Sequence, residues 1–176
     1  MGEVVLFIAA SLDGFIARKD GDISWLQKYE GKKEDYGYSE FMKTVGASIM
    51  GSKTYEKCLT FPNWPEDEKP IFVVTNRKLK AANRANVSFY SGGLARLVKR
   101  LKQENKGNVW LVGGGSLVQS FLKEKLVDRI ILSTIPVVLG MGISLFGQAN
   151  GNTDFELASV KKYESGIIQA DYKVKK

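Results

Sequence analysis

The sequence contains no histidine, and this absence excludes more chemistry than any residue present. It removes the commonest general base and every Ser/His or Cys/His nucleophilic arrangement. The single cysteine, Cys58, has no second cysteine to form an internal disulfide and no histidine to share a metal with. We therefore expect no metal site and none of the usual histidine-dependent hydrolase mechanisms.

Long apolar runs are also missing. The longest one near the start, residues 4–10, is interrupted by Ser11 and Asp13, whereas a spanning helix needs about 20 apolar residues. Met1-Gly2-Glu3 places an acid where a secretory signal needs a basic flank. These features predict a cytoplasmic protein that does not enter a membrane. With 176 residues and 44% hydrophobic content, the chain is expected to form a single domain, 1–176.

Apolar runs of strand length recur along the chain with helical patterns between them. Leu94, Leu97, Val98 and Leu101 follow the spacing of an amphipathic helix. The last two runs flank the turn Glu164-Ser165-Gly166, which predicts a terminal antiparallel hairpin. The alternation predicts an α/β fold with largely parallel strands. The predicted strands cover residues 4–10, 47–50, 71–75, 87–90, 109–112 and 130–134, and the hairpin covers 155–163 and 167–174.

A net charge of +7 permits a polyanionic partner or a small acidic ligand. The basic residues Lys99, Arg100 and Lys102 lie on the amphipathic segment, where a solvated helix surface is the simpler interpretation. The other basic residues are scattered, without an aromatic and basic recognition motif. We therefore expect a small-molecule ligand and no nucleic acid.

The most informative segment is an apolar strand that runs through Gly113, Gly114 and Gly115 into a helix-compatible sequence. Ser116 and Gln119 fit a capping box, which predicts that the helix begins at Ser116. Glycines let a backbone approach a pyrophosphate closely, and the amides and dipole of the helix start face the anion. The segment therefore predicts a phosphate cradle; the alternative is a tight turn whose glycines serve geometry alone.

Two further turns follow predicted strands and carry cations. One is Gly51-Ser52-Lys53-Thr54, and the other is Thr75-Asn76-Arg77. Ligands collect beyond the carboxyl ends of parallel strands, so all three turns can face one crevice. A pyrophosphate site together with Lys53 and Arg77 for an additional phosphate matches NADPH better than NADH.

The familiar phosphate motifs do not fit these turns. Val118 stands where a Rossmann fingerprint needs glycine or alanine, and an apolar stretch stands where it needs a later acid. Ser52 separates Gly51 from Lys53, which breaks the pattern of a P-loop. The phosphate site therefore belongs to another fold.

Four segments in this order resemble the dihydrofolate reductase-like superfamily, and within it the RibD C-terminal domain of riboflavin biosynthesis reductases. They are residues 9–17, 50–56, 112–116 and 136–146. The resemblance implies a three-layer fold with a mixed, mostly parallel sheet, a C-terminal antiparallel hairpin and helices on both faces. It also implies a homodimer that reduces a pyrimidine or pteridine-like small molecule with NADPH, most like 5-amino-6-(5-phosphoribosylamino)uracil reductase. Dihydrofolate reductase and a non-catalytic NADP-binding protein are the alternatives.

The resemblance also assigns cofactor contacts. Ala9 and Ile16 would present backbone groups to the nicotinamide carboxamide. Trp25 would lie beside the cofactor, although a plain core anchor is an equal interpretation. The remaining assignments are Gly51, Ser52, Lys53 and Thr54 at the phosphates, Thr75, Asn76 and Arg77 around the 2′-phosphate, and Gly113, Gly114, Gly115, Ser116 and Leu117 at the pyrophosphate.

The residues around the acceptor are less clearly indicated. Dihydrofolate reductases place a buried carboxylate on the helix before the turn at residue 51, and here Asp35 and Glu40 are close by, neither of them clearly in register. Tyr36, Tyr38 and Glu40 are candidate substrate contacts. Asp13 is the leading catalytic candidate, acting through water or as a substrate ligand, and its alternative role is to shape the Asp13-Gly14 turn.

Overall fold

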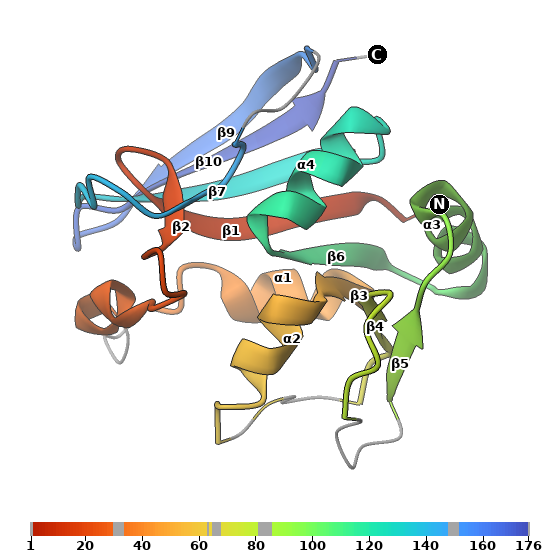
Figure 1. Ribbon diagram of the computed structural model, residues 1–176. Coiled ribbons are helices and arrows are strands. Elements are labelled where there is room, and N and C mark those ends of the chain that lie inside the picture. Colours follow the sequence, from red (N-terminus) through yellow and green to blue (C-terminus); the bar gives the residue numbers. More distant parts are fainter. Residues whose placement is uncertain are drawn as a thin grey trace.

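The computed structural model describes residues 2–29, 34–62, 64, 68–80, 86–147 and 152–175. Eight strands form one sheet in the order β5-β4-β3-β6-β1-β7-β10-β9 (Figure 1). The pairs from β5 to β7 are parallel, whereas β10 pairs antiparallel with both β7 and β9. This confirms the predicted mixed, mostly parallel sheet with a C-terminal hairpin. The strands are β1 (Val4–Ser11), β3 (Val45–Gly51), β4 (Ile71–Val74), β5 (Val87–Tyr90), β6 (Asn108–Gly113), β7 (Arg129–Ile135), β9 (Phe155–Lys162) and β10 (Ile168–Val174).

Helices cover both faces of this sheet because successive residues of each buried strand point to opposite sides. Leu6 of β1 packs in one core cluster with Leu97 and Phe121, which come from two helices on one face. Val5, the neighbour of Leu6, packs with Phe41 on the other face. The helices are α1 (Tyr38–Thr44), α2 (Ser52–Cys58), α3 (Leu94–Glu104), α4 (Gly115–Lys123) and the short 3₁₀ helix η1 (Ser24–Tyr29). The described part of the chain contains no helix of the length and apolarity needed to cross a membrane.

A second, two-stranded sheet was not predicted from the sequence. It pairs β2 (Phe15–Ala17) antiparallel with β8 (Ile143–Ser144). Strands this short carry no recognisable alternation of apolar and polar residues. The small sheet matters for the site because β8 lies against the first turn of α4, where a Cβ on Gly115 would come within 2.4 Å of the Ser144 carbonyl oxygen.

The carboxyl ends of β1, β3, β4 and β6 meet at one edge of the sheet, because these strands are parallel neighbours. Met50 pairs with Gly113, and Gly51 pairs with Val74. The three turns that the sequence predicted as phosphate sites therefore start side by side at this edge.

Candidate functional site

The glycine turn after β6 requires glycine for two reasons. Gly113 has a φ of 133° and Gly114 a φ of 96°, which side chains rarely adopt. Gly115 has no room for a Cβ beside Ser144. The two positive-φ glycines turn the chain so that α4 begins at Gly115, one residue before the predicted start.

The predicted capping box at Ser116 is therefore wrong. Gly114 occupies the N-cap position, and no side chain caps this helix. The amides of Leu117 and Val118 bond instead to the carbonyl oxygen of Gly114, at 2.9 and 3.0 Å. Ser116 lies inside the first turn of α4 and lines a cavity that opens in front of the turn.

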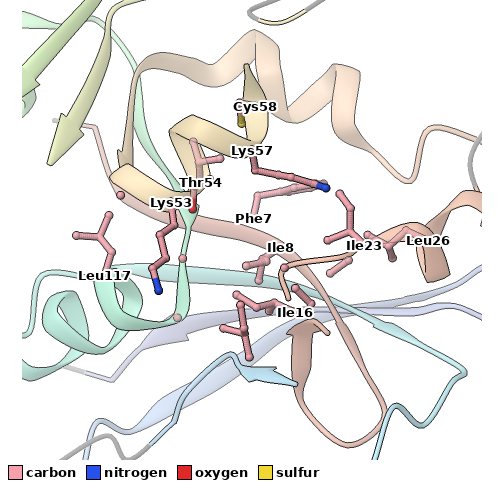
Figure 2. Close-up of a pocket in the computed structure, with 18 of the residues that line it drawn as sticks. Phe7, Ile8, Ile16, Ile23, Leu26, Lys53, Thr54, Lys57, Cys58 and Leu117 are labelled. Carbon is pink, nitrogen blue, oxygen red and sulfur yellow. The ribbon is translucent and has the colours of Figure 1, made fainter. Parts of the chain in front are cut away.

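The start of α2 lies against the glycine turn. The Thr54 hydroxyl lies 3.3 Å from the Gly113 carbonyl oxygen and donates to it. Lys53, one residue earlier, extends from α2 toward the first turn of α4 (Figure 2). A lysine ammonium and the first turns of two helices therefore face the same space, which suits an anionic group.

One cavity of about 1710 Å³ runs from these turns across the end of the sheet. Most of the residues predicted to hold the cofactor line it, which brings segments far apart in the sequence to one wall. These residues are Ala9, Ile16, Gly51, Ser52, Lys53, Thr54, Gly114, Gly115, Ser116 and Leu117. Their individual contacts with a cofactor stay predictions.

The residues predicted around the 2′-phosphate lie in a separate groove of about 380 Å³. Thr75, Asn76 and Arg77 line it together with Phe89 and Tyr90. The Thr75 hydroxyl accepts a hydrogen bond from the Arg77 amide at 3.0 Å, which shapes the turn after β4.

Arg77 connects this groove to the large cavity. Its guanidinium makes two hydrogen bonds with the carboxylate of Glu56, at 2.7 and 3.0 Å, and approaches the Ser52 hydroxyl at 3.5 Å. Glu56 itself lines the large cavity. These bonds, donated by Arg77 to the carboxylate, hold the pKa of Glu56 below its ordinary value and raise the pKa of Arg77.

Aromatic side chains line another region of the cavity, on the face of the sheet that α1 covers. Phe7 stacks on Phe41 with ring centroids 4.5 Å apart, and Trp110 meets Phe41 edge-on at 5.8 Å. The Trp110 indole N–H donates to the Phe7 carbonyl oxygen at 3.2 Å. Tyr38 lies edge-on to Trp110 at 5.9 Å. Phe7, Tyr38 and Trp110 thus form a fixed aromatic wall of the cavity.

A hydrogen-bonded network supports the polar part of this region. The side-chain amide of Gln169 donates to the Ser133 hydroxyl and to the Tyr36 carbonyl oxygen, both at 2.9 Å. The Tyr163 hydroxyl donates to the side-chain amide oxygen of Gln169 at 3.2 Å. Ser133 is buried and lines the cavity. Tyr36, whose φ is 53°, is thereby held at the cavity.

Two of the three predicted acceptor contacts reach the cavity. Tyr36 and Tyr38 line it, whereas Glu40 is exposed on α1 and forms an ion pair with Lys43. Lys57 was not predicted. It lies one helical turn after Lys53 on α2 and extends the other way, toward Ile23 and Leu26 (Figure 2). The four-residue spacing of two lysines was the signal that could have indicated it.

Asp13 is not one of the described residues that line the cavity. Its carboxylate accepts hydrogen bonds from the Ser11 hydroxyl at 2.6 Å and from the amides of Leu139 and Gly140 at 3.1 and 2.7 Å. These bonds, led by that from Ser11, hold the pKa of Asp13 below its ordinary value. The contacts favour the turn-shaping role of Asp13, and its catalytic role stays a prediction.

Trp25 packs in a core cluster beneath η1 with Tyr29, Ile135, Tyr163 and Ile167. Its indole N–H is buried and makes no hydrogen bond within the described residues. Its neighbours Leu26 and Tyr29 line the cavity, and Trp25 does not. This position favours the core-anchor interpretation over the predicted cofactor contact.

The acidic groups along the cavity are solvated. Asp20, Asp35 and Glu56 are exposed, and Glu34 is half-buried. Burial raises the pKa of the Cys58 thiol to about 11, so this cavity-lining cysteine stays protonated. Among the described residues, no buried carboxylate faces the aromatic region.

A protein-family comparison matches residues 3–169 to the RibD C-terminal domain. The chain belongs to the RibD C-terminal domain family.

Relatives of this RibD C-terminal domain protein span almost its whole length. The uncharacterized protein YwjB of Bacillus subtilis (strain 168) is 41% identical over 94% of each chain. A crystal structure from Shewanella sp. PV-4, of a protein provisionally assigned to riboflavin biosynthesis, superposes with a TM-score of 0.90 at 30% identity and covers 99% of both chains. Dihydrofolate reductase from Enterococcus faecalis, complexed with NADP(H), shares the fold with a TM-score of 0.65 at 15% identity over 99% of this chain and 98% of that one. The predicted family and fold are therefore confirmed.

Proposed function

We propose that the protein is an NADPH-dependent reductase that transfers a hydride to a pyrimidine, most like 5-amino-6-(5-phosphoribosylamino)uracil. The observation that carries this proposal is the composition of one cavity. One region of it is built from a glycine turn, Lys53 and Thr54, and another from aromatic rings, and Lys57 lines it as well. A dinucleotide and a flat acceptor need such a pair of adjoining sites.

The residues of the first region fit the cofactor. Gly114 and Gly115 line the cavity and carry no side chain, so a phosphate can approach their backbone closely. Gly113 to Leu117 with Ser52 to Thr54 would hold the pyrophosphate, and Thr75 to Arg77 the 2′-phosphate. Ala9 and Ile16 would hold the nicotinamide edge. The bound cofactor would supply the hydride, and the protein's task is to position the two rings and exclude water.

The residues of the second region favour a pyrimidine over folate. Phe7, Tyr38 and Trp110 offer apolar faces for a flat ring, and the Ser133 hydroxyl can bond to a ring edge. The described cavity residues include no buried carboxylate of the kind a pterin ring requires. Lys57 provides a cation for an acceptor that carries a phosphate.

The test is a direct titration with NADPH and NADH followed by an activity assay. The wild-type protein should bind NADPH more tightly than NADH, and Arg77→Ala should weaken NADPH by about tenfold, the low end for a charged hydrogen bond because Arg77 is exposed. Arg96→Ala, on the exposed side of α3, is the matched control. Equal losses for both cofactors would remove the 2′-phosphate assignment.

The activity assay follows the absorbance of the reduced nicotinamide with a phosphoribosylamino-pyrimidine and with dihydrofolate. Oxidation with the pyrimidine alone supports the proposal. Turnover of dihydrofolate at ordinary enzyme rates would favour the folate alternative. Binding of NADPH without oxidation by either compound would favour the non-catalytic NADP-binding protein. Two observations fit that alternative: backbone amides hold Asp13 in place, and the carboxylates along the cavity are solvated.

A further inference from the structure

Glu56 is an unexpected neighbour for a phosphate site. It lies on the cavity side of α2, three residues after Lys53. Its carboxylate accepts two hydrogen bonds from the guanidinium of Arg77. A planar guanidinium offers the same paired geometry to a carboxylate and to a phosphate. The carboxylate of Glu56 thus occupies one edge of the Arg77 guanidinium to which a phosphate could bind.

We propose that Glu56 sets the cofactor preference of this protein by competing with the 2′-phosphate for Arg77. This inference rests on the proposed function, because it requires the adenosine end of the cofactor to reach Arg77. It concerns the last residue of the 50–56 segment, to which the resemblance assigned no role.

The competition follows from charge and exposure. The carboxylate is ionised at neutral pH, since hydrogen bonds from Arg77 hold its pKa below the ordinary value and Lys53 adds to the effect. The two side chains are 55% and 43% exposed, so the pair is easily rearranged in water. A phosphate that binds Arg77 must displace Glu56 or lie beside its negative charge.

Glu56 should affect the binding of NADH differently. NADH carries a 2′-hydroxyl in place of the phosphate, and a carboxylate at this place in a dinucleotide site can accept a hydrogen bond from that hydroxyl. Glu56 therefore disfavours NADPH while it leaves NADH unaffected or favours it. The pair Arg77 and Glu56 should give a weaker preference for NADPH than Arg77 would give alone.

The decisive variant is Glu56→Gln, which keeps the size of the side chain and removes its charge. We expect NADPH to bind more tightly and the ratio of the NADH to the NADPH dissociation constant to rise by about fivefold or more, the effect of a like charge at contact distance in water. Calorimetric titration of the purified chain with each cofactor measures this ratio. Adenosine 2′,5′-bisphosphate and 5′-AMP, titrated in the same way, isolate the phosphate.

Glu104→Gln is the matched control, because Glu104 forms an exposed ion pair with Arg100 on α3. Its cofactor ratio should equal that of the wild type. An unchanged ratio in Glu56→Gln, with wild-type NADPH binding intact, would overturn the competition and leave the proposed function standing. A lower ratio would mean that Glu56 positions Arg77 for the phosphate. If the wild type bound neither cofactor, the proposed function and this inference would both fall.

Discussion

At the scale of single residues, a substitution of Asp13 can distinguish its catalytic role from its turn-shaping role. Its carboxylate joins the turn after β1 to the segment at Leu139 and Gly140. An amide in its place can accept through one oxygen only, and its NH₂ group would face a backbone N–H. Asp13→Asn should therefore lower the melting temperature at neutral pH and leave the pH profile of kcat unchanged. Thermal unfolding and a pH–rate profile are the measurements.

The difference in stability should also depend on pH. The pKa of Asp13 is lowered in the folded state, chiefly by the Ser11 hydroxyl, so the carboxylate stabilises the fold above the unfolded pKa of about 3.9 and loses this effect as pH falls through the folded value. Wild type and variant should converge in acid. Asp154→Asn, at an exposed position, is the control. Loss of one limb of the kcat profile in Asp13→Asn would instead indicate a catalytic role.

The residues of the phosphate turns could be predicted from the sequence because each turn is contiguous. Gly113 to Ser116 and Gly51 to Thr54 carry their chemistry within four neighbouring positions. The acceptor region could not be predicted in this way. Phe7, Trp110 and Ser133 come from three strands and meet only through the strand order and the side that each residue faces.

Structural elements were easier to predict than the exact points where they begin. The strands of the main sheet and α3 were indicated by apolar runs and helical spacing, which depend on burial averaged over many residues. The start of α4 depended on the close approach of β8, a contact between positions distant in sequence. Local capping preferences carry no information about that contact.

The first turn of α4 gives a prediction at this scale. A methyl group on Gly115 would overlap the Ser144 carbonyl oxygen, 2.4 Å away, so Gly115→Ala must push β8 and α4 apart. We expect a loss of about 1–3 kcal/mol in the free energy of unfolding, as for other overpacked sites. NADPH affinity should fall as well, because the displaced turn no longer presents its amides in place. Urea unfolding and cofactor titration measure the two effects.

Gly93→Ala is the matched control for this change. Gly93 is likewise a glycine at the start of a helix, the N-cap of α3, but its φ is −67° and a Cβ there would meet nothing within 4 Å. Its unfolding free energy should change by less than about 0.5 kcal/mol. Wild-type stability and NADPH binding in Gly115→Ala would contradict the role assigned to the turn.

At the scale of the whole molecule, the two ends of the sheet differ. The phosphate turns follow β4, β3 and β6, in the half of the sheet that ends at β5, whereas the β9–β10 hairpin forms the other end and β9 is the outer strand (Figure 1). The register of the hairpin places Leu157, Val160 and Ile168 on the same face as Ala170 and Tyr172. These three apolar side chains are 57%, 56% and 49% exposed. An exposed apolar strip beside an outer strand is a favourable surface for association.

We expect a second copy of this chain to cover the strip, which gives the predicted homodimer a location. Val160→Lys places a charge in the middle of the strip and should convert a dimer into a monomer of half the mass, because burying an unpaired charge outweighs the apolar contact. Light scattering after size-exclusion chromatography measures the mass. Ser159→Lys changes the neighbouring residue on the opposite face of β9 and should leave the dimer intact. A wild-type monomer at micromolar concentration, or a dimer that persists in Val160→Lys, would show that this face is not the interface.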